Sequence, residues 1–216
     1  MPHSHVSAPR TAAGERTTAL ARIVDVVLDP GAAFAEVRSR PTWGVAFLAL
    51  VALRFGSVLA FYNPETTPAK LVSGVLFQLV TLFPLVIATS TLLWIVALSW
   101  RSRLTYASAW CVATHVTLAH SLLTVAIASV AGALLPESVD VQLRHPPFTN
   151  VGFLVDATNN PLLHTLAAEL DLRSGYEAAL AWLGVRSGSN ASPWRSAGTV
   201  LTCVAIIATL SMMSAR

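Results

Sequence analysis

The chain has 216 residues, of which 54% are hydrophobic and 12% are charged, and its mean hydropathy is +0.62. A soluble domain of this length carries about twice that share of charged residues, so the composition argues against an ordinary water-soluble protein. The net charge of +3 comes mainly from arginines that lie beside apolar stretches, not in one basic patch, which argues against nucleic-acid binding. We therefore expect an all-α polytopic membrane protein whose first partner is the lipid bilayer.

The chain opens with a polar segment, residues 1 to 17, that contains no apolar run able to act as a secretory signal. We expect a disordered tail here and an amino terminus that stays in the cytosol. In residues 18 to 41, apolar side chains recur at helical spacing and charged ones lie on the other side. This pattern predicts amphipathic juxtamembrane helices, which lie in the membrane interface or dock against cytosolic loops of the same protein.

Asp29 and Pro30 divide this segment into two helices. Asp caps free backbone amides and Pro suits a first helical turn, so the second helix is expected to begin at this pair. Phe34 and Val37 then give the second helix an apolar face.

Residues 42 to 216 are expected to form one membrane domain. Four apolar runs are long enough to cross a bilayer, and they lie at about 43 to 62, 71 to 99, 106 to 134 and 196 to 213. A fifth candidate, at about 171 to 186, is shorter and carries Glu177, so hydropathy alone ranks it as marginal. With this candidate included, the sequence predicts a five-transmembrane-helix bundle.

The positions of the arginines support the fifth span. Nine of them fall on one side of the membrane only if the region from 171 to 186 crosses it: Arg10, Arg16, Arg22, Arg38, Arg40, Arg101, Arg103, Arg186 and Arg195. Arg and Lys are enriched in cytoplasmic loops, so this side is expected to be the cytosol. The carboxyl terminus and the long polar connection at 137 to 160 would then lie outside the inner membrane.

Arg54 lies near the middle of the first span, where a charged side chain is costly and needs a partner. Arg54 lies about 12 Å inside the external end of that span. Glu177 lies about 9 Å inside the external end of the candidate span at 171 to 186, which is the fourth in chain order. Long side chains can bridge the difference in depth. We therefore predict a buried ion pair between Arg54 and Glu177 that joins the first and fourth spans.

Three further polar residues could complete a network around this pair, namely Gln78, His120 and Tyr176. Two alternatives to the ion pair remain open. The polar residues could line a path for an ion or polar substrate, or Arg54 could reach the external surface without a protein partner.

No motif in the chain indicates catalysis, a cofactor or a metal site. His115 and His120 are five residues apart on a predicted helix, so they do not share one metal-binding face. Cys111 and Cys203 lie in separate apolar runs, and two distant cysteines do not make a zinc site. We expect a protein that is not an enzyme and holds no cofactor and no metal.

Three local stretches carry a family resemblance: LDPGAAFAEVRSRPTWG ahead of the first span, SRLTYASAW at the third, and LDLRSGYEAALAWLGV at the fourth. Together they resemble the bacterial branch of the Yip (Ypt/Rab-interacting protein) domain family. The matching positions are Asp29, Pro30, Phe34, Asp171, Leu172, Tyr176 and Gly184. The resemblance implies a five-span helical bundle with a cytosolic amino terminus. Arg173 departs from the family pattern, which has an apolar or aromatic residue there.

These observations favour a non-enzymatic membrane protein that acts as an accessory subunit, scaffold or membrane organiser. It would work through helix–helix contacts with other integral membrane proteins, as part of a larger complex or as a homo-oligomer. The alternative is a small oligomeric channel or transporter with a polar path near Arg54 and Glu177.

Overall fold

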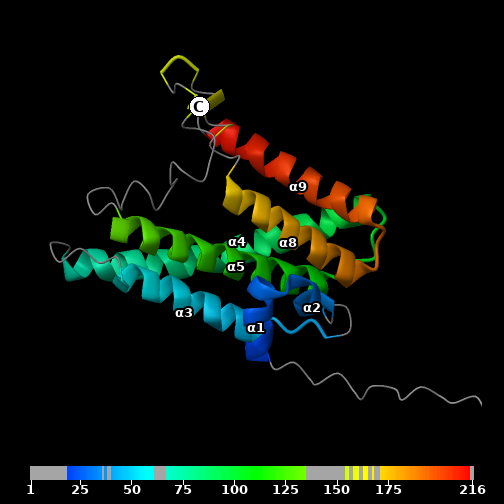
Figure 1. The fold of residues 1–216 in the computed structure, drawn as a ribbon, viewed down its shortest axis with the longest axis horizontal. Coiled ribbons are helices and arrows are strands. Elements are labelled where there is room, and N and C mark those ends of the chain that lie inside the picture. Colours follow the sequence, from blue (N-terminus) through cyan, green and yellow to red (C-terminus); the bar gives the residue numbers. More distant parts are fainter. Residues whose placement is uncertain are drawn as a thin grey trace, which may run out of the picture.

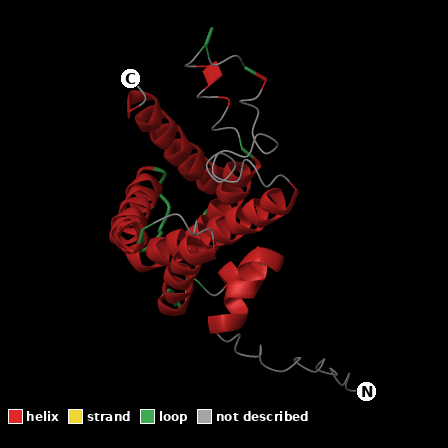
Figure 2. Cartoon of the chain, turned by 90° about the vertical axis from the view of Figure 1, so that its left-hand side faces the viewer, coloured by secondary structure: helices red, strands yellow, loops and turns green. Residues whose placement is uncertain are grey.

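The fold is described by a computed structural model that covers residues 19–35, 37, 40–60, 67–134, 154–155, 158–160, 163–164, 167 and 171–214. The main elements are α1 (Ala19–Leu28), α2 (Pro30–Ala35), α3 (Gly44–Ala60), α4 (Pro68–Ser99), α5 (Tyr106–Leu134), α8 (Leu172–Ser189) and α9 (Pro193–Ser214). Within the described ranges the chain is helical and forms no β-strand, as Figure 2 shows, which confirms the expected all-α class. The predicted tail at 1 to 17 and residues 137 to 153 of the predicted external loop lie outside the described residues.

Three of the helices are long and apolar enough to cross a membrane. They are α4, α5 over Tyr106–Val130, and α9 over Pro193–Met213. The shorter α3 is apolar over Gly44–Val58, and α8 is the least apolar of the long helices because it contains Arg173, Glu177 and Arg186. Helices therefore occupy all five predicted span positions, and three of them qualify as spans by length and composition.

The central helix of the bundle is α5 (Figure 1). It packs against α3, α4 and α8, while α9 packs against α4 and α8. Every residue from Cys111 to Ala119 is buried, so this part of α5 forms the middle of the core. Because α3 and α8 contact different sides of α5, the central helix separates them.

Two glycines show that α8 runs antiparallel to α5. A Cβ at Gly184 would lie 2.6 Å from Cγ1 of Val112, and one at Gly188 would lie 3.5 Å from Cβ of Ser108. Residue numbers therefore increase along α8 in the direction in which they decrease along α5. With 18 residues, α8 is about 27 Å long, close to the thickness of a bilayer's hydrocarbon core.

Replacing Gly184 by alanine is expected to lower the stability of the folded protein by about 1–3 kcal/mol, because the new methyl group overlaps Val112. Gly175→Ala is the matched control in the same helix, since a Cβ there meets nothing within 4 Å. The control should be neutral, or stabilising by up to about 1 kcal/mol, through helix propensity. Thermal melting in mild detergent measures both. Equal melting of the two variants would contradict the close packing of α8 on α5.

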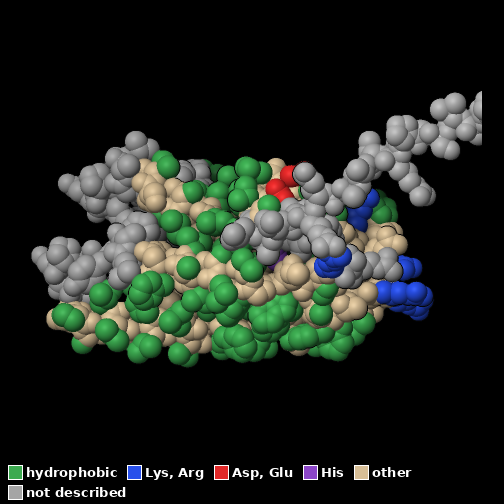
Figure 3. Space-filling view, turned by 90° about the horizontal axis from the view of Figure 1, so that it is seen from below, with side chains coloured by type: hydrophobic (Ala, Val, Ile, Leu, Met, Phe, Trp, Pro, Cys, Tyr) green, Lys and Arg blue, Asp and Glu red, His purple; other side chains and the backbone are tan. Residues whose placement is uncertain are grey.

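Cationic side chains gather toward one end of the bundle, and the face seen in Figure 3 is otherwise largely apolar. The exposed arginines at this end are Arg40 before α3, Arg101 and Arg103 between α4 and α5, Arg186 in the last turn of α8, and Arg195 in the first turn of α9. Exposed apolar side chains follow α4 and α9 along their length. A basic end next to apolar sides is the distribution expected of a membrane protein.

The two short helices at the start of the described chain dock against the bundle. The Asp29 carboxylate accepts a hydrogen bond from the amide of Ala32 at 3.1 Å, and α2 begins at Pro30, which confirms the predicted helix start. Phe34 is 1% exposed and meets the ring of His115 edge-on, with centroids 6.3 Å apart. The helices α1 and α2 thus pack on the bundle, α1 against α3 and α5 and α2 against α8. Of the two expected placements, this packing favours docking against the protein.

Candidate functional site

The structure gives Glu177 a different partner from the one expected. Its Oε2 lies 3.0 Å from Nδ1 of His120 on α5, and within the described part of the chain no ion pair joins Arg54 to Glu177. The reason is that α3 and α8 pack on different sides of α5. The sequence-based prediction compared depths along the membrane normal, and similar depth did not make the two residues neighbours.

The contact between His120 and Glu177 lies at mid-height in the bundle. His120 is the middle residue of α5, with fourteen residues of the helix on either side. The side chains of His120 and Glu177 are 31% and 39% exposed, respectively. The two atoms are close, but Nδ1 makes no hydrogen bond. The contact is therefore mainly electrostatic, and it is strongest when His120 is protonated.

A second charged pair lies at the start of α8. Asp171 caps this helix by accepting a hydrogen bond from the amide of Arg173 at 2.9 Å. The Arg173 side chain folds back, and its Nε donates to Oδ2 of Asp171 at 2.8 Å. Both residues are buried, at 8% and 6% exposed. Arg173, which stood out as a departure from the family pattern, thus neutralises the capping carboxylate.

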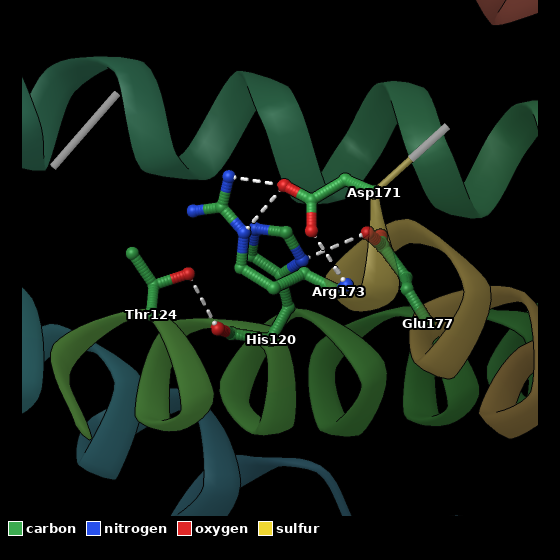
Figure 4. A network of polar contacts seen from close by, with 5 residues as sticks. All are labelled: His120, Thr124, Asp171, Arg173 and Glu177. Atoms are coloured by element: carbon green, nitrogen blue, oxygen red, sulfur yellow. Dashed lines mark hydrogen bonds and ion pairs between the residues drawn. The ribbon is translucent and has the colours of Figure 1, made fainter. Parts of the chain in front are cut away.

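These two pairs form one polar cluster between α5 and the first two turns of α8 (Figure 4). Its members, with the hydroxyl of Thr124 nearby, are His120, Asp171, Arg173 and Glu177. The cluster has no net charge when His120 is protonated and a charge of −1 when it is neutral. It therefore attracts a hydrogen-bond donor or a cation on its exposed side. Sequence reasoning missed the Asp171–Arg173 pair, although an Asp at a helix start with Arg two residues later is a visible signal.

The other members of the predicted network lie elsewhere. The hydroxyl of Tyr176 donates to the backbone carbonyl of Val26, which ties α8 to α1. Arg54 and Gln78 belong to α3 and α4, and within the described part of the chain neither makes an ion pair or hydrogen bond with Glu177. Nε of Arg54 is buried and has no hydrogen-bond partner. Of the predicted network, the structure thus brings together only His120 and Glu177.

The positions that carried the family resemblance mostly have structural roles. Asp29 and Pro30 begin α2, Phe34 is buried against α5, and Gly184 allows close approach of α8 to α5. Leu172 is the exception, since it is 69% exposed. These residues hold the helices together and do not converge on one reactive centre.

Among the described residues, no group of three or more His, Cys, Asp or Glu side chains could hold a metal ion. His115 is buried, and its Nδ1 lies 2.8 Å from the backbone carbonyl oxygen of Cys111. His115 faces α2, while His120 faces α8, as expected from their spacing on one helix.

The described residues form a helical protein with three helices long and apolar enough to span a membrane and a polar cluster beside its central helix. In comparisons with known proteins, no family model, no curated protein and no solved structure matches the chain.

Proposed function

We propose that the chain is a non-enzymatic, five-span protein of the Yip-domain type that serves as an accessory or scaffold subunit in the inner membrane. It binds a helix of another integral membrane protein, and the docking site is the exposed side of the His120–Glu177 pair. The amino terminus lies in the cytosol and the carboxyl terminus outside.

The five-span arrangement is supported by the position of α8. It lies antiparallel against the middle of α5, and it ends beside Leu104 and Ser108 at the arginine-rich end. Its charged residues do not all face outward, because Asp171 and Arg173 neutralise each other in the bundle. A helix with internally paired charges can cross a bilayer that its hydropathy alone would not favour.

The observation that carries the proposed function is the partial exposure of a carboxylate at mid-height in the bundle. Glu177 is in contact with His120 at the middle of α5, and its side chain is 39% exposed. Lipid tails offer neither counter-charge nor hydrogen bonds, and an ionised carboxylate at the bilayer centre costs about 2.5–3.5 kcal/mol on the insertion scale. A partner helix that brings a hydrogen-bond donor removes this cost, which is a physical reason for association.

Site-specific photo-crosslinking in intact membranes tests this function. A photoreactive side chain in place of Ser174, which is exposed one turn before Glu177 in α8, should form one defined protein adduct. The same group in place of Leu98, an exposed residue of α4, serves as the control and should react with lipid. Glu177→Gln should weaken the Ser174 adduct about tenfold, because it removes the charge that the partner meets.

Two results would contradict the proposal. In the first, the photoreactive group at position 174 gives only lipid adducts, as the control at position 98 does. In the second, the purified protein passes ions across liposomes and Glu177→Gln stops the flux without changing the melting temperature. The second result would favour the channel or transporter alternative.

A further inference from the structure

A second polar layer lies on the other side of α5, at the junction of α3, α4 and α5. The junction is built around one buried apolar cluster that contains Leu50 of α3, Leu82 of α4 and Leu118 of α5. These leucines come from three helices that all pack on one another.

Hydrogen bonds and the apolar cluster fix the direction of each helix at this junction. The carbonyl of Thr42 accepts a hydrogen bond from Sγ of Cys111, and farther along both helices Leu50 and Leu118 belong to one apolar cluster, so α3 runs parallel to α5. The hydroxyl of Thr91 bonds that of Tyr106, whereas Leu82 belongs to the same cluster as Leu118, so α4 runs antiparallel to α5.

One helical turn farther from the arginine-rich end, all three helices present a polar residue. A turn is about 3.6 residues, so Leu50 is followed by Arg54 on α3, and Leu118 by Ser121 on α5. On the antiparallel α4, the residue one turn from Leu82 in the same direction is Gln78. Glu177 is not part of this layer, because its helix α8 packs on α2, α5 and α9 and not on this junction.

Two atoms of this layer are buried and make no hydrogen bond. They are Nε of Arg54 and Oγ of Ser121. Ser121 is 4% exposed, whereas Arg54 and Gln78 are partly exposed, so the layer can be reached from the surface of the bundle. A guanidinium is always charged, and leaving it desolvated and unpaired is costly.

We propose that Arg54, Gln78 and Ser121 form a binding site for a phosphate oxyanion. A guanidinium binds phosphate through two parallel N–H donors, and a hydroxyl and a carboxamide supply further donors. The site lies six residues from the end of α3, about 9 Å, which is within reach of a lipid headgroup where a charged residue thins the bilayer. The phosphate can belong to an anionic phospholipid or be free inorganic phosphate. This site is independent of the helix docking proposed at Glu177.

Thermal melting of the purified full-length protein in detergent tests the site. Added phosphatidylglycerol should raise the melting temperature, whereas phosphatidylcholine, whose phosphate is already balanced by its own choline, should raise it much less. Arg54→Gln should abolish the shift. Lys70→Gln is the matched control, because Lys70 is an exposed cation at the same end of the bundle, and it should keep the shift. A shift of similar size with inorganic phosphate alone would identify the free anion as the source.

Ser121→Ala separates binding from folding. Because its hydroxyl has no partner, the variant should melt no lower than the wild type when no lipid is present. Its affinity for phosphatidylglycerol should nevertheless fall about tenfold, through the loss of one hydrogen bond to a charged group. The proposal is overturned if neither phosphate source stabilises the protein, or if Arg54→Gln and Ser121→Ala bind as the wild type does.

Discussion

Replacing Arg173 by alanine is expected to lower the free energy of unfolding by about 3–5 kcal/mol, because it leaves a buried carboxylate without its partner. Asp171 is 8% exposed, and the Arg173 side chain donates to it through Nε and Nη2. Thermal melting in mild detergent measures the loss. The first turn of α8 should also become accessible to proteases, because this pair holds the helix start in place.

A double variant provides the control for this prediction. Asp171→Ser combined with Arg173→Met removes both charges together while the serine keeps the helix cap. Replacing a complete buried ion pair by groups of similar size is often nearly neutral, so the double variant should melt close to the wild type. If the double variant is as unstable as Arg173→Ala, the loss does not come from an unpaired carboxylate.

Replacing Phe34 by alanine is expected to cost about 3–5 kcal/mol and to detach α2 from the bundle. Among the described residues, Phe34 is the largest fully buried side chain, at 1% exposed, and it contacts the ring of His115. Leu28→Ala is the control on the neighbouring helix, because Leu28 is 77% exposed and its truncation should change stability little.

Limited proteolysis distinguishes docked helices from helices that lie in the lipid interface. Cleavage between α1 and α3 should become faster in Phe34→Ala and remain slow in Leu28→Ala. If both variants behave as the wild type, α1 and α2 are held by the membrane and not by the bundle.

The positions of the helices along the chain could be predicted from the sequence because each helix depends on a local pattern of residues. Apolar runs predicted helices close to α3, α4, α5 and α9, and the Asp29–Pro30 pair predicted the start of α2. The arginine-rich end was also visible, because basic residues follow the ends of apolar runs along the chain.

The lateral order of the helices could not be read in the same way. Hydropathy gives the depth of a residue in the membrane but not which helices are neighbours, so Arg54 and Glu177 were paired across α5. An amphipathic face looks the same whether lipid or protein covers it, which is why the docking of α1 and α2 was not the favoured placement. Nothing in the sequence indicated a binding role for Ser121, because a single serine in an apolar helix commonly hydrogen-bonds its own backbone.

The two polar sites beside α5, the cluster at Glu177 and the layer at Arg54, have different physical environments and are proposed to bind different partners. The cluster at Glu177 presents a partly exposed carboxylate, which suits a hydrogen-bond donor from another helix. The layer at Arg54 has donors and a fixed positive charge, which suits an anion. A scaffold that holds a protein on one side and an anionic lipid on the other is consistent with both.

The proposed function requires α8 to cross the membrane, and labelling of single cysteines in intact cells with a membrane-impermeant maleimide measures this. Asn159→Cys lies ahead of α8 and Trp194→Cys lies after it, and both positions are exposed. The native thiols Cys111 and Cys203 are buried and should give little background. We predict that Asn159→Cys is labelled from outside and that Trp194→Cys is labelled only after the membrane is permeabilised. Labelling of both positions from the same side would contradict the five-span arrangement and the functions proposed from it.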